Sequence, residues 1–285
     1  MRRFGLGFVL LLAACAIPLV AGCESAVDEP ELVERSESAT PPYDGPLDAN
    51  AAVAALECDG KTPYERGEGS YDDGLATVQG SAEAALGDYM RESGLSYIAP
   101  ADGYAVEREQ AGQVLLSYDV DGRTKVSMLA ADDVRDWNDD EGWGVRAWAQ
   151  CDPSEFPEDV TEELDIGVWE DESGGRVPVT SIQSLKGSEH CDETDITYVL
   201  VGPEETADWY VSDTRGRDGD DFSGLLRTTF SEKARLPEGA TDTGWRRGGR
   251  QLWIGPENEA AYLVSLLDAD DVERWPAAKE PLWCA

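Results

Sequence analysis

The chain has 285 residues, and its 59 acidic side chains against 23 Lys and Arg give a formal net charge of −36 at pH 7. A surface this acidic repels nucleic acid and anionic lipid head groups, which excludes nucleic-acid binding and excludes membrane attachment through charge. The length suits two domains of ordinary size.

Residues 1–22 have the form of an export signal. Arg2 and Arg3 precede an apolar run that is too short to cross a bilayer and that ends in Val20-Ala-Gly-Cys23. Small residues before a Cys resemble the lipobox of bacterial lipoproteins, in which diacylglycerol acylates the Cys thiol, so we expect palmitate-type lipid on Cys23. The alternative is an ordinary secretory signal peptide in which Cys23 is incidental. Loss of Arg2 and Arg3 with the signal would leave 21 − 59 = −38 charges.

Residues 23–50 are acidic and Pro-rich, with few aromatic residues. Such a segment buries too little apolar surface to offset its ordering, so we expect a disordered tether. The lipid and the tether together predict a protein held on the extracytoplasmic face of the cell membrane through its N-terminal lipid.

The first predicted domain covers residues 51–152. Ser81 is a good cap for a helix whose apolar side chains recur at helical spacing, and Gly94 would end that helix. Strands follow, and Asp121-Gly122 between two apolar runs predicts a tight hairpin. A last alternating strand, residues 143–150, leads to Cys151.

The second predicted domain covers residues 153–285. A Gly174-Gly175 turn indicates a hairpin at its start. The expected elements that follow are strands at 196–202 and 209–213, a short helix at 223–230 that matches the Ser81 helix, and a hairpin of 252–255 with 261–267.

Two pairs of cysteines share one spacing, since 151 − 58 = 93 and 284 − 191 = 93. A phrase also recurs, Val126 to Trp137 against Val264 to Trp275, each with Asp-Asp-Val inside it. We therefore expect an α+β fold made of two tandem copies of a small helix-on-antiparallel-sheet domain, each closed by a disulfide. The pairing Cys58–Cys151 and Cys191–Cys284 is preferred, and a Cys151–Cys191 bridge that staples the domains together is the alternative.

Several phrases are similar to an uncharacterised group of actinobacterial secreted proteins and lipoproteins, for which no activity is established. They are Ala149-Gln-Cys-Asp-Pro-Ser-Glu-Phe-Pro157, Gly187-Ser-Glu-His-Cys191, Trp209-Tyr-Val-Ser-Asp213, Ala240-Thr-Asp-Thr-Gly-Trp-Arg-Arg247, Gln251-Leu-Trp253 and Val272-Glu-Arg-Trp-Pro276. The chain departs from that group at Ser188, where Pro is usual, and at Glu193, where an aromatic residue is usual. The resemblance implies export and the cysteine frame.

His190 is the single histidine, so it is either a general base oriented by a neighbouring acid or a polar residue packed beside a disulfide. The pairs Asp132-Asp133 and Asp270-Asp271 are either turn caps or carboxylates for Ca²⁺ or glycoside hydrolysis, and we prefer the caps. The sequence lacks the spacing of a zinc site and the common catalytic motifs. We expect no metal, no cofactor and no catalytic residue.

The cluster Arg246, Arg247 and Arg250 is the basic exception on an acidic chain. With His190 it is the candidate ligand or partner site, and the alternative is a hairpin edge charged against aggregation. These observations predict a non-enzymatic binding or interaction protein, with an envelope protein as a possible partner. The competing interpretations are an envelope hydrolase with a His or carboxylate-centred site, and a structural acidic surface protein without a specific ligand.

Overall fold

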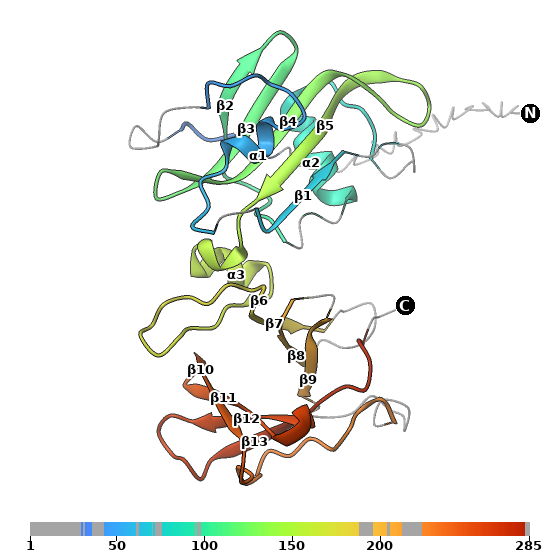
Figure 1. Ribbon diagram of the computed structural model, residues 1–285. Helices are drawn as coiled ribbons and strands as arrows, with labels where there is room; N and C mark the ends of the chain where they lie inside the picture. The colour runs from blue at the N-terminus through green and yellow to red at the C-terminus, as the bar shows by residue number, and fades with distance from the viewer. Residues whose placement is uncertain are drawn as a thin grey trace, which may run out of the picture.

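The computed structural model describes residues 30, 32–35, 43–60, 63–69, 71, 76–93, 95, 98–187, 196–203, 206–212 and 224–282. These residues form three antiparallel sheets and short helices (Figure 1). The first sheet lies at one end of the molecule and the other two lie at the opposite end, with helix α3 between them (Figure 1).

The first sheet has five strands in the order β1-β5-β4-β3-β2. Asp121 and Gly122 both have positive φ, 52° and 75°, as the predicted two-residue turn requires. The elements of this part are α1 (Ala51–Ala55), β1 (Glu65–Glu68), α2 (Ala82–Glu92), β2 (Tyr104–Gln110), β3 (Gln113–Val120), β4 (Arg123–Arg135) and β5 (Glu141–Gln150).

Helices cover both faces of this sheet. Helix α2 begins at the predicted cap, where Ser81 Oγ accepts a hydrogen bond from Ala84 N at 3.1 Å, and it buries Leu86 and Met90 in one core. Helix α1 is small-sided and packs on the other face, over Leu115 and Leu129. Strand β4 is therefore buried on both sides over most of its length, which explains its nearly continuous apolar run.

Beyond the first sheet, two four-stranded sheets pack face to face. Tyr210 and Ile182 from one sheet share a core with Leu252 and Leu263 from the other. Their strands are β6 (Ile166–Gly167), β7 (Ile182–Lys186), β8 (Thr197–Val201) and β9 (Asp208–Ser212) in one sheet, and β10 (Thr241–Arg247), β11 (Arg250–Ile254), β12 (Ala260–Ser265) and β13 (Val272–Pro276) in the other.

The two sheets also meet along both margins. Tyr210 of β9 forms an antiparallel bridge with Ala277, directly after β13. On the other side Glu170 bridges Arg246 of β10, through Glu170 N to Arg246 O at 2.9 Å and Arg246 N to Glu170 O at 2.8 Å. The sandwich is thus joined at two seams, and the Arg246 seam positions the groove described below.

The connector between the two ends packs on the first core. It contains the 3-10 turn η2 (Pro153–Glu155) and the helix α3 (Glu158–Glu163). Phe156 is 1% exposed in the core beneath α2, and Val160 packs beside it. Residues beyond the expected boundary at 152 therefore contribute to the hydrophobic core of the first domain.

The expected pair of helix-on-sheet copies is wrong. In the described residues the second part has no counterpart of α2, because a second sheet covers the inner face where a helix would lie. The repeated phrase also takes different structures: Asp132-Asp133 lie within strand β4, whereas Asp270-Asp271 lie in the turn before β13. Of the helix expected at 223–230, Gly224 and Leu225 are helical, but the chain leaves the helix at Leu226, which forms an isolated strand bridge with Ala278.

The disulfide expected at Cys58–Cys151 is present, and the described residues contain one disulfide in all. Cys191 and Cys284 lie outside the described residues, so the second expected bridge stays a prediction. Cys151 is completely buried at the end of β5, and the bridge ties it to the segment that follows α1.

Part of the segment expected as a tether lies on the first domain. Val33 N donates to Tyr104 O at 2.8 Å, and Arg35 forms ion pairs with Glu107 at 2.8 Å and Asp119 at 3.2 Å. Pro30 lies against helix α2 at Gly87. In the described parts of the chain, every helix is too short or too polar to cross a membrane.

Candidate functional site

The three arginines of the predicted basic cluster fall in the described residues, and the structure divides them. Arg246 and Arg247 end strand β10, while Arg250 begins β11 across a two-residue turn. Gly248 and Gly249 make this turn with φ of 57° and 75°, values that glycine adopts without strain. His190 and Cys23 lie outside the described residues, so their expected roles are predictions still.

Arg250 is neutralised by two acids around the start of β13, across β12 from its own strand. Its Nη2 lies 3.2 Å from Asp271 Oδ2 and 3.0 Å from Glu273 Oε1, and its Nη1 donates to Leu263 O at 3.1 Å. This guanidinium fastens β11 to the end of the sheet. It is therefore a structural group, and it does not belong with the other two arginines.

Arg246 and Arg247 line a groove of about 890 Å³ that runs between α3, the 170–176 turn and the ends of β10 and β12. We call it the arginine groove. Arg176 reaches it from the connector, and Ile166, Val168 and Leu266 supply apolar wall. Its acidic lining consists of Glu158, Glu162, Glu170, Asp171 and Glu172.

Arg247 is the least satisfied cation in this groove. Its guanidinium forms no hydrogen bond or ion pair with any described residue. It is pressed against strand β6, since a Cβ built on Gly167 would lie 2.6 Å from Arg247 Cζ. This partial burial lowers the pKa of Arg247, and the nearby charge of Glu162 opposes the shift only in part. The residue as a whole remains exposed to the groove.

Arg246 is weakly paired. Its Nη2 lies 3.6 Å from Glu172 Oε1, and Glu172 is a carboxylate with 69% of its side chain exposed. The Nε of Arg246 is buried and has no hydrogen-bond partner among the described residues. Arg247 thus presents to the groove donors that the described residues leave unused, whereas the unused Nε of Arg246 is buried.

The turn facing the arginines is organised by Asp171. Its Oδ1 accepts hydrogen bonds from Ser173 Oγ at 2.6 Å, Ser173 N at 2.8 Å and Gly175 N at 2.9 Å. The bond from the Ser173 hydroxyl, followed by those from the two amides, lowers the pKa of Asp171. The charge of Asp171 is therefore engaged within its own turn and is poorly placed to neutralise Arg247.

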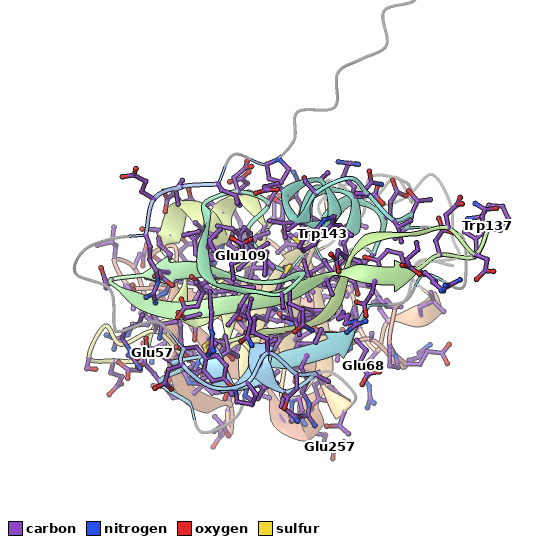
Figure 2. All side chains as sticks on the ribbon, turned by 90° about the horizontal axis from the view of Figure 1, so that it is seen from above. Glu57, Glu68, Glu109, Trp137, Trp143 and Glu257 are labelled. Atoms are coloured by element: carbon purple, nitrogen blue, oxygen red, sulfur yellow. A yellow bond between two sulfur atoms is a disulfide. The ribbon has the colours of Figure 1, made fainter. Side chains whose placement is uncertain are left out.

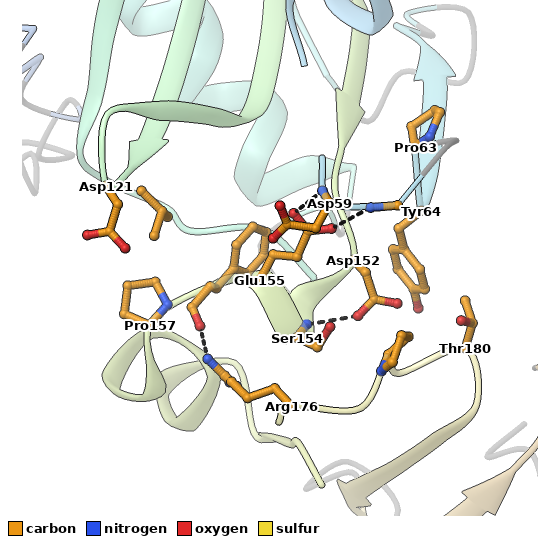
Figure 3. Close-up of a pocket in the computed structure, with 14 residues that line it drawn as sticks. Asp59, Pro63, Tyr64, Asp121, Asp152, Ser154, Glu155, Pro157, Arg176 and Thr180 are labelled. Carbon is orange, nitrogen blue, oxygen red and sulfur yellow. Dashed lines mark hydrogen bonds between the residues drawn. The ribbon is translucent and has the colours of Figure 1, made fainter. Parts of the chain in front are cut away.

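A second hollow of about 970 Å³ lies on the other side of Arg176, where the connector meets the first sheet (Figure 3). Asp152 Oδ1 accepts from Ser154 N at 2.8 Å and from Val179 N at 3.0 Å, and Asp59 pairs with Arg123. The bond from Arg123 lowers the pKa of Asp59. Three of the acids in this hollow, Asp59, Asp152 and Glu155, are thus committed to the junction.

Glu155 closes that junction from the connector side. It accepts a 2.6 Å hydrogen bond from Lys125 Nζ of β4 and another at 2.9 Å from Asp59 N. Arg176 donates from Nη1 to Phe156 O and from Nη2 to Thr161 Oγ1 at 3.3 Å, and its burial lowers its pKa. These charged groups of the hollow in Figure 3 are therefore used in hydrogen bonds that hold the junction together, whereas the arginine groove has donors without described partners.

The carboxylate pairs singled out by the sequence do not come together. Asp133 pairs with Arg146 at 2.5 Å, while Asp270 N donates to Asp268 Oδ1 at 3.0 Å within a turn of the other sheet. Cys58, Cys151 and Glu155 bring possible ligand atoms within 4.8 Å of one another, but the two sulfurs are joined to each other.

Sequence reasoning missed Arg176 and the Leu266-Leu267 turn. Leu266 is 48% exposed and Leu267 is 98% exposed, and Leu266 N donates to Gly249 O at 2.9 Å, so the leucines stand beside the arginine turn. Two consecutive leucines ahead of an acidic turn are visible in the sequence, but only the register of β11 and β12 places them at the groove. No protein-family model, curated protein or solved structure matches this chain.

Proposed function

We propose that this chain is a lipid-anchored binding protein on the extracytoplasmic face of the cell membrane, without an enzymatic role. The anchor is argued from the signal-like residues 1–22 and the lipobox-like Cys23. The Cys58–Cys151 disulfide agrees with export, because such bridges persist in oxidising compartments.

The binding site in this proposal is the arginine groove, and the partner presents an anionic group to it. The observation that carries the proposal is Arg247. Its guanidinium forms no hydrogen bond or ion pair with the described residues, lies against β6 and lines a groove, on a chain that is strongly acidic as a whole. The nearby charge of Glu162 offsets the burial of Arg247 only in part, and an incoming anion that hydrogen-bonds to the guanidinium stabilises it further.

The anchor is tested with Cys23→Ala in the full chain, expressed in a bacterium that processes lipoproteins. We expect wild type to incorporate labelled palmitate and to sediment with membranes, and the variant to lose both. Cys15→Ala, a change of the other cysteine in the signal, is the matched control and should behave as wild type. Equal membrane association of Cys23→Ala and wild type would contradict the anchor.

The binding site is tested with a photo-reactive amino acid at Leu267, the exposed residue directly after the groove-lining Leu266, in cells of the organism that makes the protein. We expect a discrete covalent adduct that disappears when Arg247→Gln is added and persists with Arg135→Gln. A second probe at Trp137, which is 57% exposed at the tip of the β4–β5 hairpin (Figure 2), controls for random collision. An adduct pattern at Leu267 that is unchanged by Arg247→Gln, or the absence of any adduct there, refutes the site.

A further inference from the structure

Resting on the proposed function, we infer that the arginine groove recognises the carboxy-terminal end of a polypeptide whose last residue is aliphatic and which carries basic residues just before it. Four features of the groove lead to this occupant: the unused guanidinium, the adjoining leucines, the surrounding acids and the volume.

The guanidinium selects a carboxylate. Arginine presents a planar fork of donors that matches a carboxylate with two parallel hydrogen bonds. Arg247 makes no such bond with the described residues, and the buried Nε of Arg246 beside it is also unused. Arg247 lines the groove, so one terminal carboxylate in the groove is a fitting acceptor for its fork.

The apolar wall selects an aliphatic neighbour to that carboxylate. Ile166, Val168 and Leu266 line the same groove as Arg247, and Leu267 beside it is 98% exposed. Contact with an apolar side chain of the ligand would remove apolar surface of this leucine from water, which is favourable. In a polypeptide, the last side chain and the terminal carboxylate lie on the same Cα, which suits a wall adjacent to a cation.

The acids distinguish a peptide from other carboxylates and from a membrane. Glu158, Glu162 and Glu170 face the groove, and they repel a polyanion or an anionic lipid surface. A fatty acid offers these carboxylates no donor, whereas a peptide supplies backbone N–H groups and basic side chains. The volume of about 890 Å³ admits several residues of such a chain.

The test uses the mature full-length protein with Cys23→Ser, and the probe is the peptide acetyl-Lys-Lys-Leu with a free carboxylate. Binding is followed by the amide NMR signals of Gly167, Gly248 and Gly249. We expect saturable shifts with a Kd of about 1–10 mM, ordinary for a ligand of this size. The same peptide with a carboxamide end should bind at least about tenfold more weakly, because the fork loses its charged acceptor.

Two variants separate recognition from folding. Arg247→Gln should weaken the acid peptide at least about tenfold, while Arg135→Gln, at an exposed ion pair on the first sheet, should leave it unchanged. Gly167→Ala keeps every charge but places a methyl group 2.6 Å from Arg247 Cζ and 2.7 Å from Ser184 Cβ, so the guanidinium must move and binding should weaken as well. Unchanged signals from β12 in each variant would establish that the fold is retained.

The inference is overturned if acid and amide peptides bind equally, if Arg247→Gln has no effect, if hexanoate binds more tightly than the peptide, or if no shift occurs. One result would disprove the carboxy-terminal ligand without disproving the proposed function. An Arg247-dependent adduct at Leu267 that maps to an internal segment of the partner would leave the proposed function standing and remove the carboxy-terminal ligand.

Discussion

Replacement of Glu155 by Gln tests how the connector is fastened to the first sheet. Lys125 is 3% exposed within β4, and its Nζ donates to Glu155 Oε2 at 2.6 Å and to Glu57 O at 2.9 Å. Glu155→Gln preserves shape but leaves the ammonium without its buried counterion. Asp59 Oδ2 lies 3.7 Å away, on a side chain that is 66% exposed, and supplies weak compensation.

The expected loss of unfolding free energy is about 3 kcal/mol, the lower end of the range of 3–5 kcal/mol for breaking a buried pair from one side. Lys125→Met should cost less, about 1–3 kcal/mol, because Glu155 keeps the backbone donor of Asp59. The double variant should be more stable than the sum of the two losses predicts, by roughly 1–3 kcal/mol.

The assay is urea unfolding of the oxidised chain, with hydrogen exchange on the peptide 141–150 assigning the transition to the first sheet. Arg135→Gln is the control: Arg135 and Glu141 pair at 2.8 Å with 58% and 55% of their side chains exposed, so solvent screens the pair and its loss should hardly change the urea midpoint. If Glu155→Gln cost no more than this control, or if the double variant were simply additive, the reasoning about the junction would fail.

Three further predictions concern other parts of the chain. Gly112→Ala should destabilise the protein by about 1–2 kcal/mol in the same urea assay, because Gly112 has φ of 77° and a Cβ there would collide with Asp132 Oδ1. Gly80→Ala, whose Cβ meets nothing within 4 Å, should be neutral, and equal effects of the two variants would contradict the steric argument. Joint replacement of Cys58 and Cys151 by Ser should cost about 4–5 kcal/mol, since the bridge closes a separation of 93 residues, and an unchanged urea midpoint would refute this. The pKa of Asp171 in the folded protein is lowered below 3.8, so the hydrogen bonds that its carboxylate accepts stabilise the turn above pH 3.8 and are lost as the pH falls through the folded pKa. The amide NMR signals of Ser173 and Gly175 should therefore shift only in this acidic range. Asp171→Asn should abolish the transition.

The first sheet was largely predictable because its determinants are local. Ser81 caps α2 with its own hydroxyl, and Asp121-Gly122 sets the register between β3 and β4 through two positive φ angles. The short helix α1 was missed, since five residues with small side chains carry no periodic signal of their own. Its place is decided by the face of β4 that needs covering.

The fold of the second part could not be predicted from local sequence patterns, because its two sheets are held together by contacts between residues far apart in the sequence. A sheet and a helix can cover an apolar face equally well, and only the complete set of strands shows that β6–β9 lie over β10–β13. The arginine groove depends on the same long-range pairing: Glu170 must bridge Arg246 before the turn at 171–175 can face Arg247. The sequence places Arg246, Arg247 and Arg250 in one cluster, but in the folded sheet Arg250 forms ion pairs with Asp271 and Glu273.

The docking of residues 30–35 on the first domain bears on the height of the protein above the bilayer. With lipid on Cys23 as proposed, seven Cα steps reach Pro30, a leash of roughly 24 Å at full stretch. Because Pro30 lies against α2, that leash would keep the first domain close to the head groups. The arginine groove is built from α3, β6 and β10, so it lies where the connector meets the second pair of sheets, between the two ends of the molecule (Figure 1), and not on the part that the leash would hold at the head groups.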